Sequence, residues 1–414
     1  MISDGAVLKA ALAGIRVLDF TNLMAGPFPS LLLGFLGAEV IKVESNTRLD
    51  AARRPPYSFQ TPGQTAGGAA DNSPVFNSVN LNKLSVLLNL KEPQAIDLGH
   101  RLAAISDVVV ENMRPGVMDR LGLGYSQLRE SNPTIIMASI SGAGATGPES
   151  SYPGYAPAFS ALGGLGHLTG YSDGPPAEMH DSVDSRIGAT ALFALLTALF
   201  RRRRTGHGEF IDLSSREAIT MFSGEALMEY TMNGVVQERR GNEEPGLAPH
   251  GCYQCSGDDR WLTIAVVNQE QWQDLCRVTQ NPKWLSDPRF ADALKRWDNR
   301  EALDQLIQDW TLTRDAGETA ELLQQAGIAA DISIDGKELA ADPHLHARKT
   351  WDFVEHPILG HIQVPSPPWK FTGTPATIRA PGPLLGQHNG YVLGELLGVE
   401  REQMDQWVEN GVVD

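Results

Sequence analysis

The chain has 414 residues, and its 34 Lys and Arg against 50 Asp and Glu give a formal net charge of −16. With 42% hydrophobic residues, a chain of this length can form about two domains with sizeable cores. The acidic balance argues against a nucleic-acid partner, which needs basic faces. The most apolar stretch, 187–200, is shorter than the roughly 20 residues that span a bilayer. We find no signal peptide and too few cysteines for a disulfide framework, so we expect a cytoplasmic protein without a membrane partner.

The first 140 residues alternate between strand-like and helix-like segments. Apolar runs typical of buried strands occur at 15–20, 40–44, 85–90, 107–111 and 135–140. Helix-length segments such as 27–37 and 93–105 separate them. This alternation predicts a parallel sheet covered on both faces, that is, a Rossmann-like, doubly wound α/β domain. No G-x-G-x-x-G follows the first run, so a dinucleotide site is not supported.

The pattern changes from about residue 224. A strand-like run at 261–266 is followed by helical segments at 271–278, 301–310 and 317–326, which predicts a smaller α+β domain. We therefore place the large domain at 1–223 together with 330–414, and the small domain at 224–329.

The usual catalytic and metal-binding motifs give little information on the function of the chain. Cys252 and Cys255 form a lone C-x-x-C with no second pair to complete a zinc site, so we interpret both as structural and expect no metal. His250 lies alone in a loop and receives the same interpretation.

Three segments in the middle of the chain carry a more specific signal. They are the T-G-x-x-D-G-P-P run at 169–176, Asp184 at the start of a helical stretch, and R-T-G-x-G-E at 204–209. In these motifs the chain resembles the class III CoA-transferase family, which includes formyl-CoA transferase and carnitine CoA-transferase. Further matching elements lie at 14–27, 36–44, 82–83, 111–116 (E-N-x-R-P-G) and 385–388 (L-G-x-H).

The resemblance implies a fold and a reaction. The fold is a large Rossmann-like domain completed by the C-terminal segment, with two chains interlocked as a dimer. The reaction moves CoA from an acyl-CoA donor, with succinyl-CoA as one candidate, to a carboxylic acid acceptor, either aromatic or dicarboxylic, such as a benzylsuccinate-type acid. The substrates are CoA thioesters, and no cofactor is bound permanently.

Matching the motif residue by residue makes Asp184 the candidate nucleophile. A carboxylate can attack a thioester to give a mixed anhydride, which the CoA thiolate reopens as an aspartyl-CoA thioester. Two alternatives stay open: Asp184 as a plain helix N-cap, and Asp181 as the nucleophile if the register is shifted.

Other groups are candidates for supporting roles. Lys83, Arg114 and Arg120 lie in the elements that match the CoA side and are candidates for binding its phosphates. The glycines at 163, 164 and 166 are candidate backbone donors to an oxyanion. The stretch 241–251 matches the family's mobile glycine loop but contains fewer glycines than in formyl-CoA transferase.

Two positions bear on the acceptor. Met24 stands where the formyl-CoA branch has glutamine, and Ala156 stands where many members have aspartate. Both changes make the pocket less polar, which favours an acceptor with apolar bulk over oxalate.

Two rival functions remain. The same fold hosts α-methylacyl-CoA racemases, but these carry G-H-D where this chain has Gly154-Tyr155-Ala156. Alternatively, the chain is a structural subunit that pairs with an active paralogue, so the partner is either a second copy or a related chain.

Overall fold

The computed structural model describes residues 10–57, 70–178 and 182–414. The chain divides into two compact units, which are described separately. The larger comprises 1–166, 178–236 and 344–414, and the smaller comprises 167–177 and 237–343. The main segment of the smaller unit, 237–343, lies later in the chain than the expected 224–329, and the unit also includes the T-G-x-x-D-G-P-P segment.

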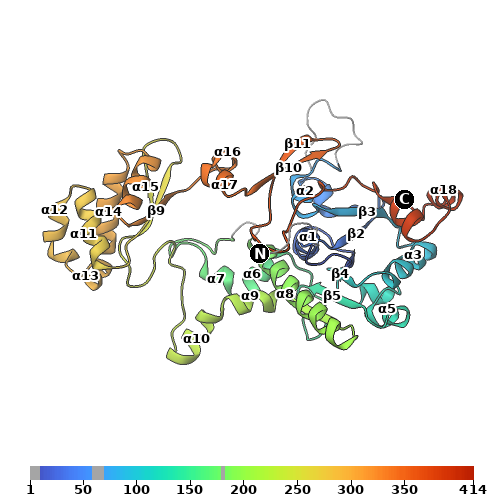
Figure 1. Cartoon of the computed structure of the whole chain (residues 1–414). Helices are drawn as coiled ribbons and strands as arrows, with labels where there is room; N and C mark the ends of the chain where they lie inside the picture. Colours follow the sequence, from blue (N-terminus) through green and yellow to red (C-terminus); the bar gives the residue numbers. More distant parts are fainter. Residues whose placement is uncertain (1–9, 58–69, 179–181) are drawn as a thin grey trace. The chain divides into compact units, whose positions relative to one another are not determined.

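A six-stranded parallel sheet forms the centre of the larger unit (Figure 1). Its order is β3-β2-β1-β4-β5-β6, and every neighbouring pair is parallel. The order reverses direction between β1 and β4, as in doubly wound nucleotide-binding folds. The strands are β1 (Arg16–Asp19), β2 (Glu39–Glu44), β3 (Lys83–Leu87), β4 (Val108–Glu111), β5 (Ile136–Ser141) and β6 (Phe210–Ser214).

Helices cover both faces of this sheet, because its strands bury side chains on both sides. One core forms against α1 and α8, and the other against α3, α5 and the C-terminal segment. The helices of this unit are α1 (Pro27–Phe35), α2 (Pro74–Val79), α3 (Pro93–Ala104), α4 (Val117–Arg120), α5 (Tyr125–Ser131), α6 (Ala156–Leu162), α8 (Ser182–Thr205), α9 (Ser215–Phe222), α10 (Gly224–Asn233) and α18 (Arg401–Glu409), with α7 (Leu165–Leu168) at the junction. The predicted α/β fold is confirmed.

Helix α8 is the longest in the described chain, at 24 residues. By length and composition alone it could cross a membrane, a property shared with core helices of soluble proteins. Its stripe of Val183, Ile187, Ala191 and Leu195 packs into the core against the sheet. We therefore interpret α8 as a core helix.

The C-terminal segment returns to the edge of this sheet. Backbone groups of Ser85, on the edge strand β3, bond to His388: the Ser85 N–H donates to Nδ1 (3.1 Å) and the His388 N–H donates to the Ser85 carbonyl (2.9 Å). The Leu87 N–H donates to the Asn389 side chain. The L-G-x-H motif therefore covers backbone groups that an edge strand would leave unpaired. The same region carries an antiparallel hairpin, β10 (Trp351–His356) and β11 (Gly360–Pro365).

The smaller unit has its own core around a three-stranded antiparallel sheet, β7-β8-β9. Its strands are β7 (His250–Gln254), β8 (Trp261–Ala265) and β9 (Ala329–Ile332). Its helices are α11 (Gln269–Val278), α12 (Pro282–Ser286), α13 (Ala293–Asp298), α14 (Arg300–Thr311), α15 (Ala316–Gln325) and α16 (Gly336–Ala341), followed by α17 (Pro343–Ala347) at the unit boundary. Cys255 and Cys276 are buried in this core as free thiols.

Charged side chains are buried where β1, β2 and β3 meet. The Lys83 ammonium pairs with Asp19 (2.9 Å), and both side chains are fully buried. Lys83 also donates to the Pro27 carbonyl (2.9 Å) and the Ser30 hydroxyl (2.8 Å), so its three protons all have acceptors within the chain. Burial raises the pKa of Asp19, but Lys83, Lys42 and two hydroxyls outweigh it and lower the pKa to about 2.

A second part of this buried cluster lies on β2. Lys42 pairs with Asp50 at 3.1 Å. Glu44 accepts hydrogen bonds from Arg53 Nε (2.8 Å) and Nη2 (2.9 Å). Arg53 also stacks on the Phe76 ring, 3.4 Å from its centroid. All these charged groups have opposite charges beside them, as buried charges require.

We predict that Lys83→Met lowers the free energy of unfolding by about 3–5 kcal/mol, because it leaves the Asp19 carboxylate buried without its partner. Lys91→Met, which replaces an exposed lysine shortly after β3, should change it by less than about 0.5 kcal/mol. Chemical denaturation of both variants measures the difference. Equal small losses would show that the fold does not depend on the Asp19–Lys83 pair.

Candidate functional site

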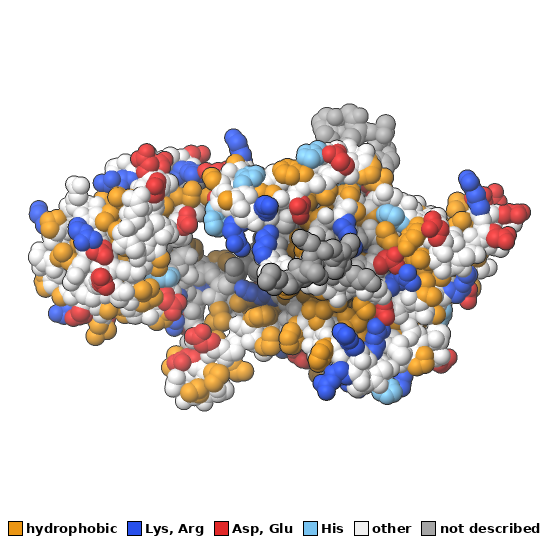
Figure 2. Space-filling model, viewed as in Figure 1, with side chains coloured by type: hydrophobic (Ala, Val, Ile, Leu, Met, Phe, Trp, Pro, Cys, Tyr) orange, Lys and Arg blue, Asp and Glu red, His pale blue; other side chains and the backbone are white. Residues whose placement is uncertain are grey.

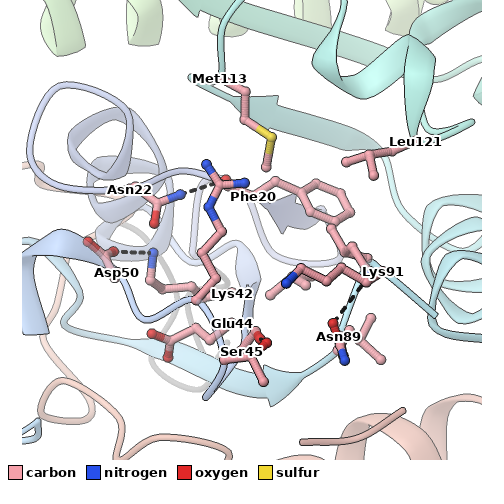
Figure 3. A pocket seen from close by; sticks show the side chains of 15 residues that line it. Phe20, Asn22, Lys42, Glu44, Ser45, Asp50, Asn89, Lys91, Met113 and Leu121 are labelled. Carbon is pink, nitrogen blue, oxygen red and sulfur yellow. Dashed lines mark hydrogen bonds and ion pairs between the residues drawn. The ribbon is translucent and has the colours of Figure 1, made fainter. Parts of the chain in front are cut away.

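A pocket of about 730 Å³, including its open mouth, lies at the carboxyl ends of β1 to β4 in the larger unit (Figure 3). Ligands of open parallel sheets bind at this edge, beside the point where the strand order reverses. The lining residues are Phe20, Asn22, Lys42, Val43, Glu44, Ser45, Thr47, Arg48, Asp50, Leu88, Asn89, Leu90, Lys91, Met113 and Leu121.

The pocket has an apolar part and a cationic part. Phe20, Met113 and Leu121 lie together on one side in Figure 3, a surface suited to a flat aromatic ring. Arg48 and Lys91 are exposed, and their charges suit phosphate groups. Sequence reasoning missed both residues. The available signal was their position just after β2 and β3, at the edge where parallel strands end.

The turn that carries Arg48 is held from the C-terminus. The Asp414 carboxylate accepts hydrogen bonds from the Ser45 hydroxyl (2.6 Å) and the Thr47 N–H (2.8 Å). Ser45 and Thr47 both line the pocket. Asp414 therefore helps to fix one wall of the pocket.

Of the three predicted phosphate-binding residues, Arg114 and Arg120 are exposed, whereas Lys83 is buried and fully hydrogen-bonded. Arg114 follows Met113 and Arg120 precedes Leu121, both pocket residues. Gly116, between them, has φ +77°, a conformation that favours glycine. The E-N-x-R-P-G motif thus forms a turn beside the pocket.

Asp184 lies in the first turn of α8 and is half-buried. Because α8 begins at Ser182, Asp184 is inside the helix and is not its N-cap. Asp181, the alternative nucleophile, lies outside the described residues. Gly188, one turn further on, sits against α1: a Cβ there would come within 2.7 Å of the Phe28 Cβ. The side of α8 that carries Asp184 therefore faces the start of α1.

Of the candidate oxyanion glycines, Gly163 and Gly164 lie in the turn between α6 and α7, and Gly166 lies within α7. Gly164 has φ +90°, and a Cβ at Gly163 would come within 2.6 Å of the Ile219 side chain. The sequence thus requires glycine here for packing against α9 and for the turn.

In the smaller unit, two distant motifs come together. The Gly241 N–H donates to the Gly170 carbonyl (2.8 Å), and the Asn242 amide donates to the Tyr171 hydroxyl (3.1 Å). The 241–251 stretch is thus attached to the T-G-x-x-D-G-P-P segment. His250 interacts with the Asn242 carbonyl (2.7 Å).

The comparisons with known proteins agree on one family. Residues 12–389 match the model of CoA-transferase family III. The chain belongs to this family. It is 34% identical to succinyl-CoA–D-citramalate CoA-transferase of Chloroflexus aurantiacus, over 94% of this chain and 95% of that protein. It is also 34% identical to the succinyl-CoA–L-malate CoA-transferase beta subunit of the same organism, over 97% and 98%.

A solved structure extends the likeness to the fold. A CaiB/BaiF family protein from Brucella suis superposes with a TM-score of 0.85 at 28% identity, covering 94% of this chain and 100% of that one. The resemblance read from the motifs is confirmed, and this family III CoA-transferase is an enzyme of the type that acts on CoA thioesters.

One group in this CoA-transferase has a strongly shifted acidity. Glu111, at the end of β4, is buried with only 4% exposure and accepts the Met113 N–H (2.7 Å). Burial raises the pKa of Glu111 to about 7, although hydrogen bonds from Ser139 and Met113 oppose the shift. The folded enzyme therefore favours the protonated carboxyl.

This acidity predicts a pH-dependent stability. The stabilisation from protonated Glu111 is complete below the ordinary carboxyl pKa of 4.5 and is lost as the pH rises through about 7, with an upper limit of about 3 kcal/mol. Glu111→Gln stays neutral, so its melting temperature should rise relative to the wild type between pH 5 and pH 8. Parallel pH curves for the two proteins would contradict this account.

Proposed function

We propose that the enzyme transfers CoA from succinyl-CoA to a dicarboxylic acid through a covalent thioester on Asp184. The observation that carries this proposal is the position of Asp184, half-buried in the first turn of α8, in a chain of CoA-transferase family III. The first turn of a helix has free N–H groups and a positive dipole end, which favour the ionised, nucleophilic carboxylate.

The proposed reaction has two symmetric halves. The Asp184 carboxylate attacks the succinyl-CoA carbonyl and the C–S bond breaks. CoA leaves as a thiolate, and a succinyl–aspartyl anhydride remains on the enzyme. The thiolate then attacks the aspartyl carbonyl, which forms the Asp184–CoA thioester and releases succinate. The acceptor carboxylate attacks this thioester and expels the thiolate again. Attack of the thiolate on the acceptor carbonyl gives acceptor-CoA and regenerates Asp184.

The pocket at the sheet edge is the proposed site for the nucleotide end of CoA. The apolar wall with Phe20 and Met113 would hold adenine, and Arg48 and Lys91 would bind phosphates, with Arg114 and Arg120 close by in sequence to its lining residues. Because all three protons of the Lys83 ammonium are donated within the chain, we assign Lys83 an indirect role, in which it stabilises the buried cluster that supports the pocket.

The named relatives guide the choice of substrates. One acts between succinyl-CoA and D-citramalate, and another between succinyl-CoA and L-malate. We therefore favour succinyl-CoA as donor and a dicarboxylic acid as acceptor. Met24 and Ala156 would make the acceptor site less polar, which leaves room for an apolar or aromatic substituent such as that of a benzylsuccinate-type acid.

We also propose that the chain works as an oligomer with a second copy or a paralogue. Helix α10 contains no buried residue, and Leu227, Met228, Tyr230 and Met232 are all at least 56% exposed. Figure 2 shows hydrophobic side chains gathered on this helix. Apolar surface of this kind usually meets a partner, and one relative is named as a beta subunit.

Asp184→Ala should lower kcat for CoA transfer from succinyl-CoA by at least about 1,000-fold, because it removes the group that forms the covalent bond. The matched control is Asp97→Ala, which removes an exposed carboxylate on α3 and should leave kcat unchanged. Release of succinate and formation of the new thioester are measured with a panel of dicarboxylic acceptors. Transfer by Asp184→Ala at near wild-type rates would refute the proposal.

Arg48→Gln should raise KM for succinyl-CoA about tenfold or more, because a charge-assisted bond to phosphate is lost. Succinyl-pantetheine lacks the nucleotide, so the same variant should use it as well as the wild type does. An equal loss with both donors would show that Arg48 does not bind the nucleotide end.

A further inference from the structure

The segment 20–28 connects the pocket to the helix that carries Asp184, all within the larger unit. At one end, Phe20 and Asn22 line the pocket. At the other end, Phe28 packs against Gly188, one turn of α8 beyond Asp184. The conformation of this short segment therefore sets the spacing between the pocket and the candidate nucleophile.

The segment contains a costly backbone conformation. Leu23 has φ +68°, in the left-handed region that a bulky residue rarely adopts. Nearby Gly26 is closely packed, since a Cβ there would come within 2.6 Å of Asn112 and 2.7 Å of Thr21. A leucine in this conformation persists only where its surroundings hold it.

Asp50 provides this constraint from one side. Its Oδ1 accepts the N–H groups of Leu23 (2.9 Å) and Ala52 (2.9 Å), and its Oδ2 lies 3.1 Å from the Lys42 ammonium. Lys42 in turn donates to the Thr21 carbonyl (2.7 Å). One buried ion pair thus fixes the backbone at Thr21 and at Leu23, as Figure 3 shows for Asp50 and Lys42.

Asn112 constrains the segment from the other side. Its Oδ1 accepts the Asn22 N–H (2.8 Å), and its amide nitrogen donates to the Asn22 carbonyl (2.9 Å). Asn112 comes from the turn after β4 and Asp50 from the loop after β2. The segment that follows β1 is therefore held by side chains from the loops after both neighbouring strands, β2 and β4.

We propose that Asp50 is a positioning residue for CoA transfer: it holds Leu23 in its left-handed conformation and so fixes the pocket at the correct distance from Asp184. This inference rests on the proposed function of the pocket and of Asp184. A nucleotide anchored in the pocket leaves the pantetheine arm a fixed length to reach the nucleophile. A small displacement of the segment would then misplace the thioester, and misplacement by about 1 Å can cost 100-fold in rate.

The test combines Asp50→Ala with Leu23→Gly. Asp50→Ala should weaken the binding of free CoA, measured by calorimetry, and lower kcat/KM for succinyl-CoA, each by at least about tenfold. Succinyl-pantetheine is not anchored in the pocket, so its kcat/KM should change by less than about threefold. Glycine adopts positive φ without strain, so adding Leu23→Gly to Asp50→Ala should recover at least about threefold in CoA binding and in kcat/KM.

A conservative variant distinguishes a loss of positioning from a loss of folding. The side-chain oxygen of Asp50→Asn can still accept both N–H groups, so this variant should retain more CoA binding than Asp50→Ala. Circular dichroism checks that each variant is folded.

The inference is overturned if Asp50→Ala binds CoA as the wild type does, if it loses activity equally with both donors, or if Leu23→Gly restores nothing. The measurement of CoA binding tests the inference independently of catalysis. A wild type that binds CoA but forms no thioester on Asp184 would refute the proposed function and leave the positioning role to be decided by calorimetry.

Discussion

The architecture of the site depends on the pairing of charges that are buried away from water at one edge of the sheet. Asp19 needs Lys83, Asp50 needs Lys42, and Glu44 needs Arg53, because an unpaired charge in this interior would be strongly destabilising. The Asp19–Lys83 pair joins β1 to β3, which are distant in sequence, and the other two pairs join β2 to the loop that follows it. Arg53 extends the cluster further, since it also donates to Asp71 and to the Pro383 carbonyl of the C-terminal segment. Satisfying these charges therefore fixes the loops whose outer surfaces form the pocket.

This constraint explains how an acidic protein can prepare a site for anionic substrates. The buried lysines are neutralised by carboxylates, so the free positive charge near the pocket comes from exposed residues such as Arg48 and Lys91. The candidate nucleophile lies on a different element, α8, and is related to the pocket through α1. In the proposed function, binding and chemistry are thus carried by separate elements of the larger unit. We infer that their alignment depends on the segment after β1, which is held by hydrogen bonds and contains a leucine in the left-handed conformation.

Much of the fold could be predicted from the sequence, because its strands are short apolar runs separated by helix-length segments. Asp184 was predicted at the start of a helix, and the structure has it in the first turn. The buried pairs could not be predicted, since Lys83 looks the same in sequence whether it faces a phosphate or Asp19. The expected phosphate contact of Lys83 would require a proton that is already donated inside the chain. Arg48 lies in the loop after β2, and only the folded structure, in which β2 pairs with β1, places it at the pocket.

The central claim is that CoA is carried covalently on Asp184, and the most direct measurement is to trap that intermediate. The wild-type enzyme is incubated with succinyl-CoA without an acceptor, treated with hydroxylamine, digested, and analysed by peptide mass spectrometry. The account predicts a hydroxamate on Asp184 that forms only when the thioester is present, with release of succinate. A hydroxamate on another carboxylate, Asp181 included, or turnover without any trapped adduct would contradict it.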